Sequence, residues 1–387
     1  MPKTIQVETA VRQRYSRGAR QKVRALCCPV NYDSRYLKII PSEIIQRDYG
    51  CGDPSRFLRA GETVLDLGSG GGKICYIASQ IVGAKGRVIG VDVNDEMLTL
   101  ARKYQPEMAR KLGYGNVVFH KAKIQDLALD LDLFGKHLRD KPVRSATDWI
   151  EAQAYADLLR SRQPLIGECA VDVVVSNCVL NLVQNSDKRQ LFAEIFRVLK
   201  RGGRAVISDI VSDENVPRSM QDDPRLWSGC ISGAFREDLF LEAFEEAGFY
   251  GIQILSRDRK PWRTVKGIEF RSMTVEAYKG KDGLCLERNQ AVIYKGPFKE
   301  VLDDDGHRIP RGTRFAVCDK TYQIYNREPY QSHFEPVPPL RELPLARAKT
   351  FYCGRIEPRH PRETKGMSYK VTTIPGNNGS ACEPGCC

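Results

Sequence analysis

Three cysteines of this chain stand in glycine-rich or polar surroundings that do not favour simple packing in a core. Cys51 lies between two glycines in "DYGCGDP", Cys178 follows the apolar run "VDVVVSN", and Cys230 lies in "WSGCISG". A structural cysteine normally belongs to an apolar periodic run, as Cys75 does in "KICYIAS". Three converging thiolates would suit a soft, thiophilic centre. Zinc more typically uses paired C-x-x-C spacings and four ligands, so the dispersed spacing favours a site that binds its substrate transiently.

The composition is that of an ordinary soluble globular protein. The chain has 387 residues, 42 % of them hydrophobic and 28 % charged, which is enough for two domains. No apolar run approaches the roughly 20 residues that span a bilayer. The N-terminal segment also lacks the apolar stretch of a secretory signal. We therefore expect a cytoplasmic protein with no membrane partner, in which 13 cysteines indicate metal, metalloid or redox chemistry rather than a disulfide framework.

The net charge of +12 and a pI near 9.1 could suit nucleic acid. Acidic and basic residues alternate along most of the chain, however, and no long basic block interrupts them. The pattern favours a solvated basic surface that attracts anionic ligands. We expect no nucleic-acid partner.

A repeating alternation of strands and helices positions these residues. Strands are predicted in "TVLDL", "GRVIGVDV", "NVVFHKA", "VDVVVSN" and "RAVISDI", and helices in "KICYIASQIVG", "NDEMLTLARKYQPEMARKLG" and "DKRQLFAEIFRVLKRGG". Alternation of this kind predicts an α/β fold with a doubly wound, mostly parallel sheet. Ligands bind such sheets beyond the C-terminal ends of the strands, which is where Cys178 lies.

Changes in pattern along the chain suggest four parts. Residues 1–60 form an N-terminal lead-in that carries Cys51 and begins with a basic amphipathic helix. Residues 61–257 form the α/β domain, with an insertion over residues 127–169 that contains the helical segment "TDWIEAQAYADLLRSRQ". Short strands between turns predict a β-rich module over residues 258–340. Residues 341–387 read as a basic, flexible and disordered tail that ends in "CEPGCC".

The loop "LDLGSGGGK" follows the first predicted strand and precedes a helix, as in nucleotide-binding folds. Asp92 ends the next strand 22 residues after Gly70, where a carboxylate can accept hydrogen bonds from ribose hydroxyls. The third glycine of a dinucleotide motif would fall on Lys73, so that motif fails. Asp66, two residues before Gly68, suits a cationic or amino-bearing ligand better than a pyrophosphate.

The stretch "VLDLGSGGG" resembles the first motif of class I S-adenosylmethionine-dependent methyltransferases, a Rossmann-like family. The resemblance implies that Asp92 holds the ribose, and that Ile124 and Gln125 flank the adenine. Gln125 departs from the acidic residue that the family usually has there. The expected cofactor contacts are then Asp66, Gly68, Ser69, Gly70, Asp92, Val93, Ile124, Gln125 and Asn177.

The motifs "YGCG", "SNCVLNL", "GCISGA" and "RVLKRGG", together with the glycine loop, resemble the arsenite methyltransferases over about residues 10–257. The resemblance implies that Cys51, Cys178 and Cys230 bind trivalent arsenic, which receives methyl groups in a detoxification reaction. It also implies a fourth cysteine upstream, in "ALCCPV", for thiol–disulfide exchange. Of Cys27 and Cys28 we take Cys28, acting with Cys51, and we expect thioredoxin or glutathione to restore the thiols.

Other functions are compatible with parts of this pattern. A methyltransferase for selenium or tellurium species, or for a small organic molecule, would keep the cofactor loop, but a small organic substrate would not need Cys51 and Cys230. A non-catalytic metalloid-binding protein, with the terminal cysteines as chelator, would not need Asp92. Base methylation is disfavoured, because the fourth strand ends in "SNCV" in place of an "NPPY"-type motif.

Overall fold

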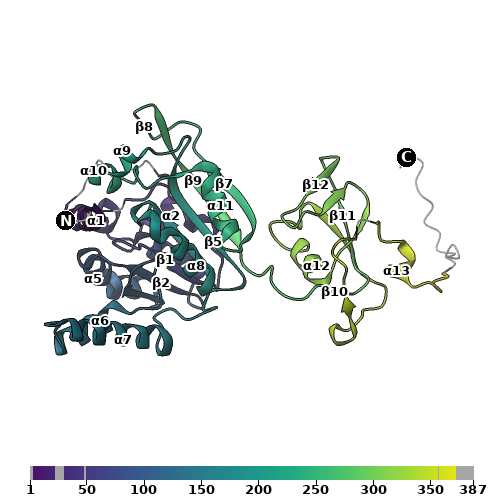
Figure 1. Cartoon of the computed structure of the whole chain (residues 1–387), viewed down its shortest axis with the longest axis horizontal. Coiled ribbons are helices and arrows are strands. Elements are labelled where there is room, and N and C mark those ends of the chain that lie inside the picture. The colour runs from purple at the N-terminus through teal and green to yellow at the C-terminus, as the bar shows by residue number, and fades with distance from the viewer. Residues whose placement is uncertain (1–2, 22–29, 48, 356, 372–387) are drawn as a thin grey trace. The chain divides into compact units, whose positions relative to one another are not determined.

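The computed structural model describes residues 3–21, 30–47, 49–355 and 357–371 of the chain (Figure 1). The chain divides into two compact units, of which the first ends at Gly280 and the second begins at Lys281. The first unit therefore extends beyond residue 257, where the sequence pattern suggests a boundary. The reason is a long strand, β9 (Ile268–Tyr278), which pairs with β5 (Leu199–Ser212) over residues 270–278.

One nine-stranded sheet organises the first unit, with the strand order β3-β2-β1-β4-β5-β9-β7, while β6 pairs with β5 and β8 with β9. The strands β1 to β5 pair in parallel, as the sequence predicts, and β9 pairs antiparallel with both β5 and β7. The remaining strands are β1 (Thr63–Leu67), β2 (Arg87–Asp92), β3 (Val117–Lys121), β4 (Val171–Asn177), β6 (Phe235–Arg236), β7 (Tyr250–Arg257) and β8 (Arg263–Val265).

Helices cover both faces of this sheet because successive strand residues point to opposite sides. In β4, Val173 and Val175 pack with α4 (Lys73–Val82) and α5 (Asp95–Leu112), whereas Val174 packs with α8 (Lys188–Val198) and α11 (Glu237–Glu246). Both faces of β4 are apolar for this reason, which explains the unbroken run "VDVVV". The doubly wound α/β fold predicted from the sequence is confirmed.

Short helices and the inserted segment complete the first unit. The insertion forms α6 (Leu131–Asp140) and α7 (Ala146–Arg162), which pack together through Leu129, Ala156 and Leu159. The predicted helix in the insertion is therefore present. The other helices are α1 (Lys3–Arg20), α2 (Ser34–Leu37), α3 (Ser42–Gln46), α9 (Arg218–Gln221) and α10 (Pro224–Trp227).

The second unit is a small β-rich module, as the turn-rich sequence predicts. Its largest sheet has the order β14-β11-β15, and two further strand pairs, β12–β13 and β10–β16, lie beside it. The turn "DDDGH" joins β12 to β13, where the Asp303 amide donates to the His307 carbonyl. The elements are β10 (Leu286–Glu287), β11 (Ala291–Tyr294), β12 (Glu300–Leu302), β13 (Arg308–Pro310), β14 (Arg314–Ala316), α12 (Asp319–Tyr325), β15 (Phe334–Val337), β16 (Lys349–Thr350) and α13 (Pro361–Lys365).

The prediction of a flexible tail from residue 341 onward is wrong for residues 341–355 and 357–371. Strand β16 pairs with β10, and Phe351 is buried. Arg359 is also buried, with ion pairs of 2.8 Å to Glu287 and to Glu363. The sequence argument fails because the basic residues of this segment are not all solvated, and one carboxylate partner of Arg359, Glu287, is distant in sequence. The terminal "CEPGCC" lies outside the described residues.

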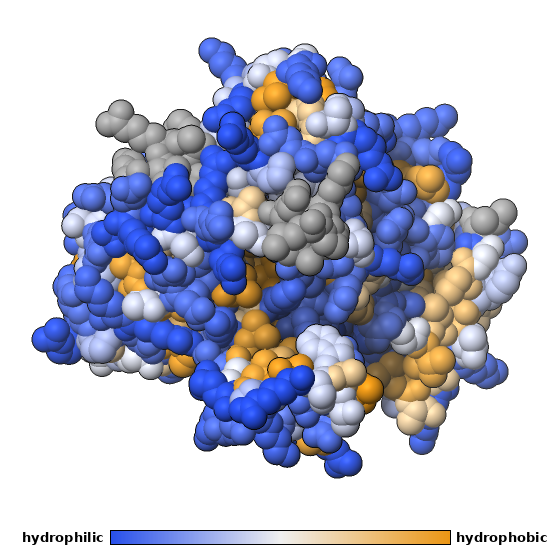
Figure 2. Space-filling view, turned by 60° about the vertical axis from the view of Figure 1, so that its left-hand side comes forward, coloured by the Kyte–Doolittle hydropathy of each residue, from blue (hydrophilic) through white to orange (hydrophobic). Residues whose placement is uncertain are grey.

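No described helix is long and apolar enough to cross a membrane. The face of the molecule in Figure 2 is hydrophilic over most of its area, with apolar residues in small separate patches.

We expect Arg359→Ala to release the segment over residues 349–365 from the second unit. Removing Arg359 takes from Glu287 its ion-pair partner, whereas Glu363 keeps Arg355, and losing one member of a buried ion pair costs about 3–5 kcal/mol in fully buried cases. Since Glu287 and Glu363 are partly exposed, we expect about 2–4 kcal/mol. Hydrogen exchange followed by mass spectrometry should show lost protection over these residues. The control is Arg308→Ala, which removes an exposed ion pair to Glu300 and should change nothing. Unchanged exchange in Arg359→Ala would show that the ion pairs do not hold the segment.

Candidate active site

The glycine loop after β1 is held against the end of β2 by its own backbone. The amides of Gly68 and Ser69 both donate to the Val91 carbonyl, at 2.8 and 3.0 Å. Gly68 has a φ of +69°, and a Cβ at this position would lie 2.4 Å from the Val179 side chain. Only glycine fits here, because the backbone is left-handed and the neighbouring chain approaches closely.

Asp92, at the end of β2, closes this loop from the other side. Its carboxylate accepts the Gly70 amide at 2.9 Å and the Asn94 amide at 2.8 Å. Burial raises the pKa of Asp92, and these backbone hydrogen bonds oppose the shift. The carboxylate therefore lies at the wall of the site with its position fixed by two amides, as a group that holds a sugar hydroxyl must.

A cavity of about 410 Å³ opens beside the loop, and all nine residues expected to contact a cofactor line it. They come from the ends of parallel strands: Asp66 in β1 and Gly68, Ser69 and Gly70 after it, Asp92 at the end of β2 and Val93 after it, Ile124 and Gln125 after β3, and Asn177 at the end of β4. The buried Ser69 Oγ has no hydrogen-bond partner among the described residues. A buried hydroxyl of this kind calls for a polar ligand or water.

Helix α1 forms a second wall of the cavity, through Thr9, Val11 and Tyr15 among others. Ser16 anchors the helix, since its hydroxyl donates to Glu96 at 2.8 Å and accepts from the Asn94 side chain at 3.0 Å. The sequence predicts a basic amphipathic helix here but gives no sign that it covers the site. The reason is that its contacts are with residues about 80 positions away in sequence.

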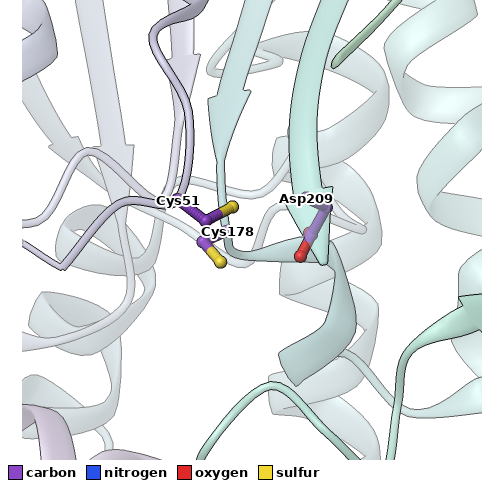
Figure 3. Close-up of side chains that lie close together, drawn as sticks. All are labelled: Cys51, Cys178 and Asp209. Carbon is purple, nitrogen blue, oxygen red and sulfur yellow. The ribbon is translucent and has the colours of Figure 1, made fainter. Parts of the chain in front are cut away.

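Three cysteines from three separate segments converge beside this cavity, and we call Cys51, Cys178 and Cys230 the cysteine triad. Each is only 5 % exposed, and the three belong to one buried cluster. The sulfurs of Cys51 and Cys178 and a carboxylate oxygen of Asp209 all lie within 4.8 Å of one another (Figure 3). The Cys230 thiol donates to the Cys178 carbonyl at 3.6 Å, and the thiols of Cys178 and Cys230 are also hydrogen-bonded to each other.

Two members of the triad have left-handed backbone conformations. Cys178 has a φ of +65° and Cys230 a φ of +62°. In a residue other than glycine this costs of order 1–3 kcal/mol and persists only where the surroundings impose it. The turn lets Cys178 leave β4 while its amide still donates to the Ser208 carbonyl of β5, at 2.8 Å. Backbone strain of this kind is found at functional sites more often than in inert cores.

The Asn177 side chain fixes the loop that carries Cys51. Its Oδ1 accepts the amides of Cys51 and Gly52, at 2.9 and 3.0 Å, and its Nδ2 donates to the Gly52 carbonyl at 2.7 Å. A Cβ on Gly50 would lie 2.2 Å from Asn177 Nδ2, and one on Gly52 would lie 2.6 Å from the Ser208 side chain. The motif "YGCG" therefore has glycines because the loop is packed directly against β4 and β5.

Asp209, in β5, is a member of the site that the sequence reasoning missed. It is 1 % exposed, and its carboxylate accepts the amides of Leu180 and Ile210, at 2.8 and 2.7 Å. Burial raises the pKa of Asp209 to about 6, against these hydrogen bonds. The available signal was an acidic residue inside the otherwise apolar strand "AVISDIV".

Two thiols of the triad have raised pKa values, which favour their neutral forms. Burial raises the pKa of Cys178 well above its usual value. The interaction with the Cys178 side chain and burial together raise the pKa of Cys230 well above its usual value. The Tyr15 hydroxyl lies 3.8 Å from the Cys230 sulfur, and burial likewise raises the pKa of Tyr15. Cys178, Cys230 and Tyr15 therefore favour their neutral forms beside the Asp209 carboxylate.

Of the other cysteines named from the sequence, Cys75 does not belong to this group. Cys75 is fully buried in the core, where its thiol donates to Asp66 at 3.2 Å. Cys28, expected to exchange disulfides with Cys51, lies outside the described residues, as does Cys27.

Known proteins resemble both units. A family model described as a methyltransferase domain matches residues 58–248, and residues 281–369 match a domain of unknown function, DUF8838. The arsenite methyltransferase of Aquipseudomonas alcaligenes is 30 % identical over 325 residues, which cover 80 % of this chain and 84 % of that protein. The arsenite methyltransferase of Mus musculus is 28 % identical over 371 residues, covering 92 % of this chain and 88 % of that one.

A solved structure extends this similarity to three dimensions. The crystal structure of an arsenic(III) S-adenosylmethionine methyltransferase from Chlamydomonas reinhardtii superposes with a TM-score of 0.54 at 25 % identity, covering 84 % of this chain and 100 % of that chain. The chain belongs to the arsenite methyltransferase family and has the class I S-adenosylmethionine-dependent methyltransferase fold.

Proposed function

We propose that this protein transfers methyl groups from S-adenosylmethionine to trivalent arsenic, as arsenite and methylarsenite, that is held by Cys51, Cys178 and Cys230. The observation that carries the proposal is the convergence of three buried thiols on one side of the cavity that the cofactor residues line. In the family, such methylation serves detoxification of arsenic.

The residues around the cavity fit the cofactor. Asp92, fixed by two backbone amides, would accept the ribose hydroxyls. Asp66 lines the cavity as a carboxylate suited to an amino-bearing ligand, and Ser69 offers a hydroxyl that lacks a partner among the described residues. Ile124 and Gln125 would flank the adenine. The bound cofactor supplies an electrophilic methyl group on a sulfonium, which the lone pair of thiolate-bound arsenic attacks in line.

The triad would bind the substrate by exchanging ligands on arsenic. Each As–S bond that forms replaces an As–O bond, and the thiol proton leaves with the hydroxide as water. No net charge is then created in a dry site, which fits thiols whose pKa is raised. The closed surroundings hold the two reactants together and exclude water. No general base is required for methyl transfer, because the arsenic lone pair carries no proton.

A thiol reductant would complete the cycle. Methyl transfer takes the arsenic lone pair, so returning arsenic to the trivalent state needs two electrons. We propose that Cys28 and Cys51 supply them by forming a disulfide, which thioredoxin or glutathione then reduces.

The first test measures methylated arsenic directly. Purified, reduced protein with S-adenosylmethionine and arsenite is assayed by chromatography with elemental detection, beside Cys178→Ser and Cys230→Ser. We expect the rate of arsenic methylation to fall at least about 100-fold in both variants. Mutating a residue that only supports a metal ligand already costs roughly 10–100-fold, and each variant removes a ligand itself. The matched control, Cys169→Ser, removes an exposed cysteine and should keep full activity. Undiminished activity in Cys178→Ser would contradict the proposed role of the triad. Activity on selenite or tellurite alone would redirect the substrate assignment.

The second test isolates the cofactor site. Asp92→Asn removes a charged acceptor, which is worth about 1.5–3 kcal/mol, so the affinity for S-adenosylhomocysteine should fall roughly 10–100-fold by titration calorimetry. Asp95→Asn, at an exposed neighbouring position, should bind normally. Equal affinities would argue against ribose recognition by Asp92.

The third test uses the protonation state of the thiols. Because the pKa of Cys178 and of Cys230 is raised, the thiolate fraction is very small near pH 7 and grows only as the pH rises past about 9. Iodoacetamide should therefore label these two residues more slowly than Cys169 at pH 7, and faster as the pH increases. Prior addition of arsenite should protect them, as read by peptide mass mapping. Fast labelling at pH 7 would contradict this picture of the site.

A further inference from the structure

The second unit contains a separate group of cysteines on three different segments, Cys285, Cys318 and Cys353, which we call the second cysteine cluster. Cys285 immediately precedes β10, Cys318 precedes α12, and Cys353 follows β16. The pairing of β10 with β16 continues one step further, since the Phe351 amide donates to the Cys285 carbonyl at 2.8 Å. The chain that leads to Cys353 therefore runs directly beside Cys285.

Packing and strand pairing bring these three cysteines close together. Cys285 packs against a small buried group made of Ala316, Cys318 and Phe351. Cys353 follows two residues after Phe351, whose amide donates to the Cys285 carbonyl. Cys318 is fixed, because it is 2 % exposed and its sulfur accepts the Thr321 amide at 3.4 Å. Cys353 is exposed and lies in a turn, so its side chain has room to adjust to a ligand.

The charge around this cluster differs from that around Cys51, Cys178 and Cys230. Burial opposes ionisation of Cys285, but hydrogen bonds from Cys353 and Cys318 and the positive charge of Lys320 outweigh it and lower the pKa. Burial and the neighbouring Cys285 raise the pKa of Cys353 to about 12. A thiol whose pKa is lowered, beside two further thiols and an ammonium group, is a favourable starting point for binding a soft electrophile.

Three sulfurs suit trivalent arsenic better than zinc. Structural zinc sites almost always have four ligands. The described part of the second unit contains only three cysteines, Cys285, Cys318 and Cys353, so a fourth thiol ligand is missing there. The nearby His307 is already engaged, since its Nδ1 lies 2.8 Å from Asp303 Oδ2 and its ring also hydrogen-bonds to the Cys353 backbone.

We propose that Cys285, Cys318 and Cys353 form a second site that binds trivalent arsenic, in addition to the site proposed for methylation. Three As–S bonds replace three As–O bonds of arsenite, and each thiol proton leaves with a hydroxide as water, so no oxidant or reductant is needed. Unlike the buried triad of the first unit, this site includes the exposed Cys353 and takes up arsenic without entry into the cofactor cavity. The site holds substrate and contributes no catalytic group.

Binding stoichiometry of the full-length protein tests this proposal. Reduced, zinc-free protein is equilibrated with arsenite, desalted, and analysed for arsenic per chain by elemental detection. We expect the variant Cys285→Ser/Cys318→Ser/Cys353→Ser to bind about one arsenic atom per chain fewer than the parent, because it lacks the second cysteine cluster. The variant Cys178→Ser/Cys230→Ser should instead lose the arsenic bound at the cysteine triad. The absorbance of arsenic–thiolate bonds in the near ultraviolet should fall in parallel. Arsenic binding at the two sites is thus measured with separate variants. A negative result for the second cysteine cluster would leave the proposed methylation site untouched, and the reverse also holds.

Further variants keep the test decisive. Cys353→Ser alone changes only an exposed residue, so it should not unfold the unit. It should lower the affinity for the arsenic bound at the second cysteine cluster at least about tenfold. Ser in place of the terminal Cys382, Cys386 and Cys387 should leave that binding intact. The proposal is overturned if the variant of the three terminal cysteines loses one bound arsenic per chain while the variant of Cys285, Cys318 and Cys353 retains it. It is equally overturned if the purified protein carries one zinc per chain that only the cluster variant lacks.

Discussion

The hydrogen bonds of one amide side chain, that of Asn177, join the parts on which this site depends. Asn177 ends a buried parallel strand, lines the cavity, and binds the backbone of Cys51 and Gly52 on both its oxygen and its nitrogen. The next residue, Cys178, turns out of the strand with a strained backbone. A single strand end therefore sets the position of the cofactor wall and of two of the three thiols.

Desolvation is the second organising force. Burial shifts the pKa of each of four groups toward its neutral form: Tyr15, Cys178, Asp209 and Cys230. Charges in such a place would be costly unless paired. Neutral thiols avoid this cost, and ligand exchange on arsenic preserves neutrality throughout. Helix α1 completes the enclosure through Tyr15, which explains why the segment before the α/β domain belongs to the same unit.

The two groups of cysteines illustrate how similar residues acquire different properties. In the first unit, burial raises the pKa of Cys178 and Cys230. In the second, Lys320 and two neighbouring thiols lower the pKa of Cys285. The difference arises from nearby charge and exposure, neither of which is visible in the spacing of the cysteines. A cluster with one exposed thiol and one thiol of lowered pKa suits capture of a soft ligand, whereas a fully buried one suits its chemical conversion.

The sequence by itself determined the parallel strands, the glycine loop, the role expected of Asp92 and the unusual character of Cys51, Cys178 and Cys230. Local rules suffice for these, because strand periodicity places residues such as Asp92 and Cys178 at one edge of the sheet. Tertiary structure alone decided that α1 covers the cavity, that Asp209 faces the thiols, that β9 extends the sheet, and that residues 341–355 and 357–371 fold onto the second unit. Each of these depends on contacts between residues far apart in the chain, such as Ser16 with Glu96 or Arg359 with Glu287, and no local pattern encodes such pairings.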